Sequence, residues 1–168
     1  LNMLMSFAEY EREMIAERTR DKIAAARRRG KWTGGLLPLG YRLEEGKLVI
    51  EEDEAMIVRE IFSLYLETRS LVHVVEQLRD RGRKTKAYVS KNGNVRSAKA
   101  WTKQSVLRVL RNPVMAGQIH SNGAFFPGEH EGIISSEDFN RVKAMLDGKP
   151  APRMPTVRNP AYVLRGVL

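Results

Sequence analysis

The 168-residue sequence predicts a mainly helical α+β protein, in which a long N-terminal helix precedes a small helical domain with a helix-turn-helix-like core and short antiparallel strands. Three observations lead to this fold class. Large apolar residues recur at steps of three and four in five stretches, which is the spacing of a buried helix face. Short β-prone runs flank Glu45-Gly46 and Asn92-Gly93, as in hairpins. The sequence contains no cysteine, so neither disulfides nor thiolate metal sites are available to it.

The first helix is expected over residues 1–29, and its character changes partway along. Up to Ile15 large apolar residues recur at helical spacing, which indicates a face packed against a partner. After Ile15 this face almost disappears, and basic residues replace it. A helix of this length spans roughly 40 Å at 1.5 Å per residue, so we expect one end to pack on protein and the other to reach a polyanion. The basic residues are Arg18, Arg20, Lys22, Arg27, Arg28, Arg29 and Lys31.

Gly30 is the predicted end of this helix, because glycine readily adopts the positive φ of a helix C-terminus. Residues 30–40 are then expected to be extended, since Gly34-Gly35 and Pro38 do not continue a helix. A slim basic segment of this kind can lie in a DNA minor groove. The alternative is a simple interdomain linker.

Residues 41–82 are expected to form scaffold. A hairpin is predicted over residues 41–50, a helix over about 52–67, and a second helix over 71–81 that Ser70 caps and Gly82 ends. The predicted buried residues are Met56, Ile57, Ile61, Leu64 and Tyr65 in the first helix, and Leu71, Val74, Val75 and Leu78 in the second.

Between residues 83 and 100 the apolar content falls and basic residues accumulate. Asn92-Gly93 predicts a hairpin, which we interpret as a wing that becomes ordered on DNA. Plain disorder is the alternative. The basic residues of this segment are Lys84, Lys86, Lys91, Arg96 and Lys99.

The stretch from Trp101 to Arg111 predicts a helix capped by Thr102, with Trp101 and Val106 as a hydrophobic staple. Its outer face offers Lys103, Gln104, Ser105, Arg108 and Arg111. Glutamine can pair with adenine, arginine with guanine and lysine with phosphate, so this is a candidate reading helix. The alternative is a basic surface helix, and the insert over 82–100 exceeds the usual turn of a helix-turn-helix.

The remainder predicts three short strands, over residues 117–120, 124–127 and 132–134, and a last helix capped by Ser135 that ends at Asp147. A proline-rich linker follows at residues 149–160.

Charge is strongly clustered along the chain, whose formal net charge is +9. Eleven basic residues and one acid lie from Arg79 to Arg111, whereas seven acids and two basic residues lie from Glu44 to Glu60. This asymmetry predicts one face for nucleic acid and another for solvent or protein. No apolar run approaches the roughly 20 residues of a membrane span and no signal peptide opens the sequence, so we expect no membrane partner and a cytoplasmic, nucleoid-associated location.

The run FAEYEREMIAERT from Phe7 to Thr19 resembles the long helix that closes the catalytic domain of serine recombinases and leads onto DNA. Its signature is Glu11-Arg12 followed six residues later by Glu17-Arg18. Gly34-Gly35 with the tetrapeptide PLGY at 38–41 is similar to the entry into the recombinase domain of the large serine integrases. The likeness continues through a second block, which comprises Trp101, Val106, Leu110, Asn112-Pro113 and Gly117.

This resemblance implies a connecting helix at 1–29, an extended linker at 30–40, a recombinase DNA-binding domain at 41–149, and at 150–168 a linker and the start of a zinc-ribbon domain. The parent protein would be a bacterial or phage-encoded enzyme that cuts DNA through a serine, forming a phosphoserine link. That serine is expected before Leu1, so the 168 residues alone are expected to be inactive. The implied partners are double-stranded DNA at an attachment site and further copies of the chain, as a dimer on each site and a tetramer across two.

Arg18 and Glu17 are the positions that the resemblance places near the active site. The alternative for them is a surface of i,i+4 ion pairs, each contributing about 0.2–0.5 kcal/mol. Ser6 has no neighbouring base or arginine cluster and is expected to pack. His73, His120 and His130 lack the spacing of metal ligands, so no cofactor is expected here, with zinc expected only in the parent's C-terminal domain. The rival functions are a stand-alone DNA-binding regulator and a basic RNA-binding adaptor.

Overall fold

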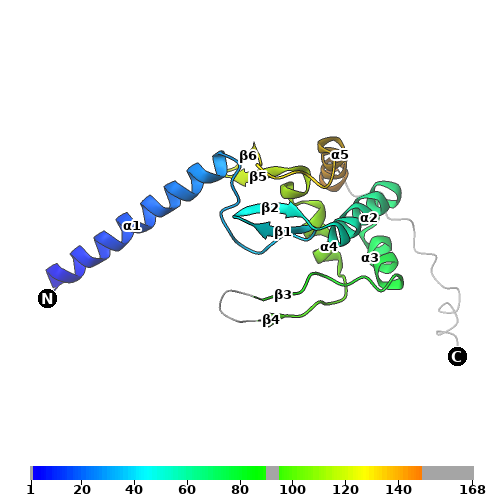
Figure 1. Cartoon of the computed structure of the whole chain (residues 1–168), viewed down its shortest axis with the longest axis horizontal. Coiled ribbons are helices and arrows are strands. Elements are labelled where there is room, and N and C mark those ends of the chain that lie inside the picture. The colour runs from blue at the N-terminus through cyan, green and yellow to red at the C-terminus, as the bar shows by residue number, and fades with distance from the viewer. Residues whose placement is uncertain (1, 90–94, 149–168) are drawn as a thin grey trace, which may run out of the picture.

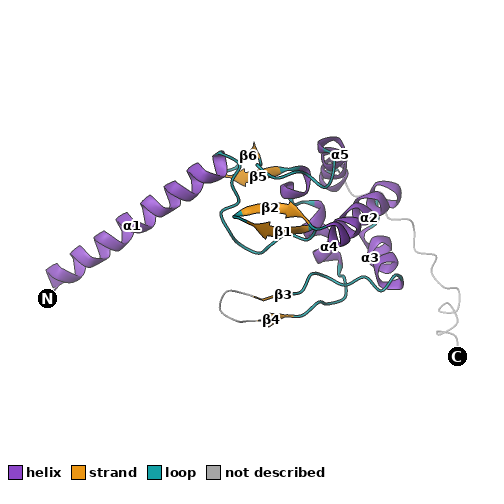
Figure 2. Cartoon of the chain, viewed as in Figure 1, coloured by secondary structure: helices purple, strands orange, loops and turns teal. Residues whose placement is uncertain are grey.

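The computed structural model describes residues 2–89 and 95–148, and over these ranges the fold is mainly helical α+β, as predicted. Five α-helices and three two-stranded antiparallel sheets make up the described chain (Figures 1 and 2). In order the elements are α1 (Asn2–Arg28), β1 (Tyr41–Glu44), β2 (Lys47–Ile50), α2 (Glu52–Thr68), α3 (Leu71–Asp80), β3 (Tyr88–Val89), β4 (Val95–Arg96), α4 (Lys103–Leu110), the 3-10 helix η1 (Pro113–Ala116), β5 (Gln118–Ser121), β6 (Ala124–Pro127) and α5 (Ser136–Asp147).

Helix α1 leaves the domain as a straight rod and packs on it only near its C-terminal end, beside β5 (Figure 1). The helix ends as predicted at Gly30, whose φ is 78°. The Gly30 amide donates to Arg27 and the Lys31 amide to Ala26, which is a Schellman closure. Gly30 also lies against the segment after β6, because its carbonyl accepts from the Glu129 amide at 2.9 Å.

The predicted hairpin is formed by β1 and β2, with Tyr41 opposite Ile50 and a tight turn at Glu45-Gly46. Both turn residues have positive φ, 48° and 81°, as a two-residue type I′ turn requires. Tyr41 is completely buried. Its hydroxyl lies 2.9 Å from the carbonyl oxygens of both Val114 and Glu131 and donates its proton to this pair, which ties the hairpin to the chain after α4.

The core is formed where α2 packs on α3, α4 and α5, and α3 also packs on α4. The predicted buried face of α2 was wrong at Met56, which is 47% exposed, and Ile57 and Leu64 are only half-buried. Ile61 and Tyr65 are buried as predicted, and Ala55, Val58 and Phe62 complete the inward face. These three additional residues also recur at steps of three and four, so helical spacing alone does not separate them from the expected set.

Three predicted helix caps are present. Ser70 accepts from the His73 amide and Ser135 from the Asp138 amide. Thr102 forms a capping box with Ser105, in which each side chain accepts from the other residue's backbone amide. These caps explain why α3, α4 and α5 begin where the sequence indicates.

The third strand predicted in the C-terminal part, at 132–134, was wrong. Gly132 lies directly against the backbone of Ala116 and Gly117, and the Ile134 amide donates to the Met115 carbonyl. This segment therefore follows η1 instead of pairing with β5 or β6, which form the hairpin by themselves.

Residues 83–89 and 95–100 form a projection that we call the arm (Figure 1). Strands β3 and β4 pair as the hairpin prediction requires. At its base the Thr85 amide donates to the Lys99 carbonyl, and the Lys99 amide to the Thr85 hydroxyl, both at 2.9 Å. The predicted turn at Asn92-Gly93 lies outside the described residues, as do Lys91, the proline-rich linker and the expected zinc-ribbon start. Among the described helices, none combines the length and hydrophobicity needed to traverse a bilayer.

Candidate nucleic-acid interface

A groove of about 790 Å³ lies between three segments that are far apart in the sequence: the linker, the arm and α4. The linker supplies Leu36, Leu37 and Leu39 to its wall. The other lining residues are Thr85, Lys86, Tyr88, Val95, Ser97, Lys99, Ala100, Trp101, Thr102, Ser105, Arg108 and Val109. The wall thus combines apolar and cationic side chains without a single carboxylate, which makes it chemically suited to a polyanion that also carries apolar surface.

Helix α4 presents Lys103, Gln104 and Arg108 to solvent, while its opposite face is buried through Val106, Val109 and Leu110. None of the three exposed side chains has an ion pair or hydrogen bond to another described residue. Two further predicted residues of this helix are engaged within the protein. The half-buried Ser105 hydroxyl belongs to the capping box, and Arg111 forms an exposed ion pair with Asp147 at 3.0 Å.

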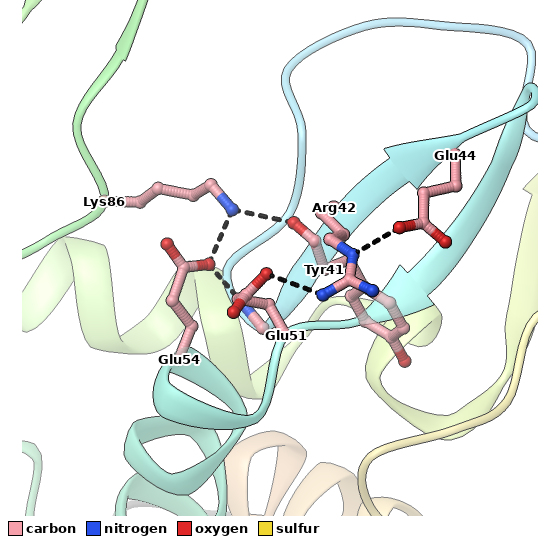
Figure 3. Close-up of polar contacts among 7 residues, drawn as sticks. Tyr41, Arg42, Glu44, Glu51, Glu54 and Lys86 are labelled. Atoms are coloured by element: carbon pink, nitrogen blue, oxygen red, sulfur yellow. Dashed lines mark hydrogen bonds and ion pairs between the residues drawn. The ribbon is translucent and has the colours of Figure 1, made fainter.

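The basic residues of the arm differ in what they contact. Lys84 and Lys99 are exposed, and the backbone of Arg96 lies in β4. Lys86 is half-buried, and its ammonium donates to the Glu54 carboxylate at 2.5 Å and to the Tyr41 carbonyl at 2.7 Å (Figure 3). This ammonium is therefore committed inside the protein, and we leave Lys86 out of the proposed contact surface.

Carboxylates of α2 pair with the root of the arm at a second place. Glu60 forms ion pairs with Arg81 and Arg83, and its side chain is only 13% exposed. The acidic and basic blocks of the sequence thus meet along one side of the arm root and are not confined to opposite faces. Sequence clustering could not show this, because the partners are separated by 21 or more positions in the chain.

The basic end of α1 lies beside β5 and the start of the linker (Figure 1). Arg18, Arg20, Lys22, Arg28, Arg29 and Lys31 are exposed. Arg27 is half-buried and donates from Nε to the Thr33 hydroxyl at 2.8 Å, which fastens the start of the linker to the helix. A smaller hollow of about 230 Å³ connects this end to the chain after α4, and its wall includes Lys31, Trp32, Asn112 and His120.

The N-terminal half of α1 carries large apolar side chains in full contact with solvent. Met5, Phe7, Tyr10 and Ile15 are each 62–66% exposed. Glu17 and Arg18 are exposed as well, and α1 contains no ion pair within 4 Å among its described residues, so the surface ion pairs considered as an alternative do not form there.

Two buried titratable groups, His130 and Tyr41, lie against each other outside the groove. His130 is 9% exposed, and its Nε2 lies 3.0 Å from the Val114 carbonyl, so this nitrogen carries the proton and donates it. Burial lowers the pKa of His130 below its ordinary value. Burial also raises the pKa of the adjacent Tyr41 to about 12. In the described ranges, no cluster of three or more acidic or histidine side chains could hold a metal ion.

Two residues central to this region were not singled out by sequence reasoning, Tyr41 and Glu54. The Tyr41 hydroxyl bonds to Val114, which is 73 positions away in the chain, and the Glu54 carboxylate bonds to Lys86, which is 32 positions away. The only local signal was the PLGY tetrapeptide, in which Gly40 places Tyr41 at the entry to the domain.

The model of a family described as Recombinase matches residues 52–149, which is more than half of the chain, and that of the family described as Resolvase, N terminal domain matches residues 1–32. No curated protein sequence matches the chain.

Two solved structures share the fold. "Crystal Structure of a LSR-DNA Complex" aligns with a TM-score of 0.62 at 24% identity, over 77% of this chain and 37% of that one. A structure concerning sequence requirements of the Listeria innocua prophage attP site aligns with a TM-score of 0.59 at 23% identity, over 80% of this chain and 51% of that one. The chain thus spans about a third to a half of the length of these structures.

Proposed function

The chain belongs to the recombinase family of the serine recombinases, and we propose that it is the region of such an enzyme that binds double-stranded DNA at a recombination site. The observation that carries the proposal is the carboxylate-free groove between the linker, the arm and α4. The two similar structures, one a complex with DNA and the other concerned with an attP site, support the same partner.

Base recognition is assigned to α4. Lys103, Gln104 and Arg108 project from one face of a short helix whose other face is fully packed. An α-helix fits the major groove, where glutamine reads adenine and arginine reads guanine through paired hydrogen bonds. The buried face keeps these side chains in a fixed register with the rest of the domain.

The linker and the basic end of α1 are assigned to the DNA backbone. Arg28, Arg29 and Lys31 are exposed next to an extended segment that is slim enough for a minor groove. By helical spacing Arg18 lies on the same side of α1 as Lys22 and Arg29, so phosphate contacts could follow the helix toward its N-terminal half. Phosphate contacts of this kind give affinity that falls steeply with salt concentration.

The whole enzyme's reaction is also part of the proposal. The hydroxyl oxygen of a serine outside these residues attacks the phosphorus of the phosphodiester and forms the phosphoserine link, while the bond from phosphorus to one deoxyribose oxygen breaks and that oxygen leaves as a hydroxyl group. Glu17 and Arg18 lie close to the scissile phosphates in this proposal. The exposed apolar side chains from Met5 to Ile15 support a protein partner for the N-terminal half of α1, either the catalytic domain or the same helix of a second copy. On this basis we divide the chain into a connecting helix at 1–29, a linker at 30–40, a DNA-binding domain at 41–149 and a following segment at 150–168.

The decisive experiment is selection of duplexes from a randomised pool by the purified chain, followed by anisotropy titration of the selected and a scrambled duplex at several salt concentrations. We expect a defined sequence preference and a falling affinity as salt rises. Structured RNA serves as competitor. Equal binding of selected and scrambled duplexes would refute sequence-specific binding, and stronger competition by RNA would favour an RNA-binding role instead.

A further inference from the structure

The carboxylate of Glu54 lies where three parts of the fold meet. One oxygen, Oε2, accepts from the Gly40 amide at 3.0 Å and from the Lys86 ammonium at 2.5 Å. The same ammonium donates to the Tyr41 carbonyl at 2.7 Å, so the contacts close a ring (Figure 3). We call Glu54, Lys86 and the backbone of Gly40 and Tyr41 the clasp. It joins the end of the linker, the first turn of α2 and the root of the arm.

The linker side of the clasp is held rigidly by packing. Gly40 has a φ of 85°, and a Cβ added to it would lie 2.4 Å from Ile133 and 3.3 Å from Val58. The Gly40 backbone therefore packs closely against Ile133 and Val58, and its amide donates to Glu54. Glu54 is in turn fixed by α2, whose start is bonded back to the linker through the Glu51 amide and the Gly40 carbonyl at 2.9 Å.

The arm side is held by ion pairs to α2 and by a bond from the Arg83 amide to the Leu78 carbonyl of α3. Its two strands pair with each other and not with another sheet of the described fold. Along α2 the arm root is bonded by Lys86 to Glu54 and by Arg81 and Arg83 to Glu60. The Lys86 and Glu54 side chains are only 18% and 25% exposed, so solvent screens this pair less than the surface pairs of the same domain. Of these contacts, the clasp alone links the arm to the linker.

We infer that Glu54 is a positioning residue, which sets the distance between the arm and the linker across the groove and thereby the discrimination between DNA sequences. The inference rests on the proposed function for its DNA part. Phosphate contacts through flexible lysines and arginines tolerate small displacements, whereas paired hydrogen bonds to base edges require fixed register. Loss of the clasp is therefore expected to reduce sequence preference more than general affinity.

The first test uses no DNA and measures the groove directly. Because the chain has no cysteine, Leu36→Cys and Val95→Cys introduce two unique thiols, on side chains that are 60% and 71% exposed and that line the groove from the linker and from the arm. Spin labels on this pair report the distance distribution between linker and arm. We expect a narrow distribution in the parent chain and a broader one with Glu54→Gln, whose amide can still accept from Gly40 but carries no charge for Lys86.

Matched variants separate the clasp from general loosening. Lys86→Met removes the ion pair from its other partner, together with the bond to the Tyr41 carbonyl, and should broaden the distribution at least as much. Lys86→Arg retains the charge and should keep it narrow. Glu51→Gln removes a carboxylate next to the same helix start, whose one ion pair with a described residue is to Arg42 of β1, so its distance distribution should match that of the parent chain. Unchanged distributions in both Glu54→Gln and Lys86→Met, with folding confirmed by circular dichroism, would overturn the inference.

The second test measures the affinity of the same variants for the selected and the scrambled duplex. Glu54→Gln should lower the affinity for the selected duplex about fivefold or more, as expected for one lost base contact, and change that for the scrambled duplex less than about twofold. Equal losses on both duplexes would overturn the specificity role. If the parent chain itself shows no preference for any duplex, the proposed function fails, while the spin-label distances still decide whether the clasp positions the arm.

Discussion

The junction between α1 and the domain depends on the backbone conformation and the close packing of Gly30, and the Gly30→Ala variant tests this dependence. Its φ of 78° lies in the left-handed region, which costs an alanine about 1–2 kcal/mol. A Cβ would also lie 2.3 Å from the Pro127 carbonyl oxygen and 3.0 Å from the Glu129 amide, both backbone atoms. Relieving that clash requires a shift that breaks the bond between the Gly30 carbonyl and the Glu129 amide, at about 0.5–1.5 kcal/mol.

We therefore expect Gly30→Ala to lower the free energy of unfolding by about 1.5–3.5 kcal/mol. Gly82→Ala is the matched control, because Gly82 has a similar φ of 65° and no atom within 4 Å of the added Cβ. It should lose only the backbone part, about 1–2 kcal/mol. Urea unfolding gives both values, and hydrogen exchange of the Glu129 amide reports the junction itself. Equal losses in the two variants, with Glu129 still protected, would refute the close-approach argument.

Three further outcomes are expected. Arg108→Ala should cost about 1–3 kcal/mol of binding free energy on the selected duplex and relax sequence specificity, whereas Arg28→Ala should weaken binding to all duplexes alike and reduce the salt slope by about one. Anisotropy titration measures both affinities. Equal losses of affinity for random DNA in the two variants would contradict the reading-helix assignment. Burial lowers the pKa of His130, so its contribution to stability is complete above its unfolded pKa of about 6.5 and is lost as the pH falls below that value, by at most about 1.4 kcal/mol per pH unit. Urea unfolding between pH 7 and 5 measures this dependence. The slope should be flattened in His130→Gln and retained in the exposed His120→Gln. Because Phe7 is 65% exposed on α1, Phe7→Glu should shift self-association toward monomer in light scattering, and a parent chain that is monomeric at high concentration with α1 ordered would count against helix pairing.

The features that sequence could predict are those determined by neighbours in the chain. Ser70, Thr102 and Ser135 cap helices through amides three positions ahead, and Gly30 ends α1 through bonds to the preceding turn. The hairpin turn at Glu45-Gly46 is equally local. Such signals depend on spacing and residue type alone, so the helix starts and the first hairpin were confirmed.

The errors and omissions concern contacts between distant segments. Met56 and Phe62 both satisfy a helical period, and only the packing of α2 on α3, α4 and α5 decides which of them is buried. Lys84 and Lys86 are equivalent in sequence, yet one is exposed and the other is bonded to Glu54 from another element. The predicted strand at 132–134 failed for the same reason, because η1 and not a strand provides its hydrogen-bond partner. The DNA contacts proposed for the exposed basic residues stay predictions.

The attachment of α1 by its last turn alone makes the rod a lever. Over its length of roughly 40 Å, a rotation of about 5° at the Gly30 joint would carry the far tip through about 3–4 Å, while the residues beside β5 would hardly move. A slight tilt of the domain on its duplex would therefore displace a partner bound to Met5 and Phe7 by about the length of a side chain. Conversely, a torque applied at the tip of the helix would act mainly on the Gly30 joint.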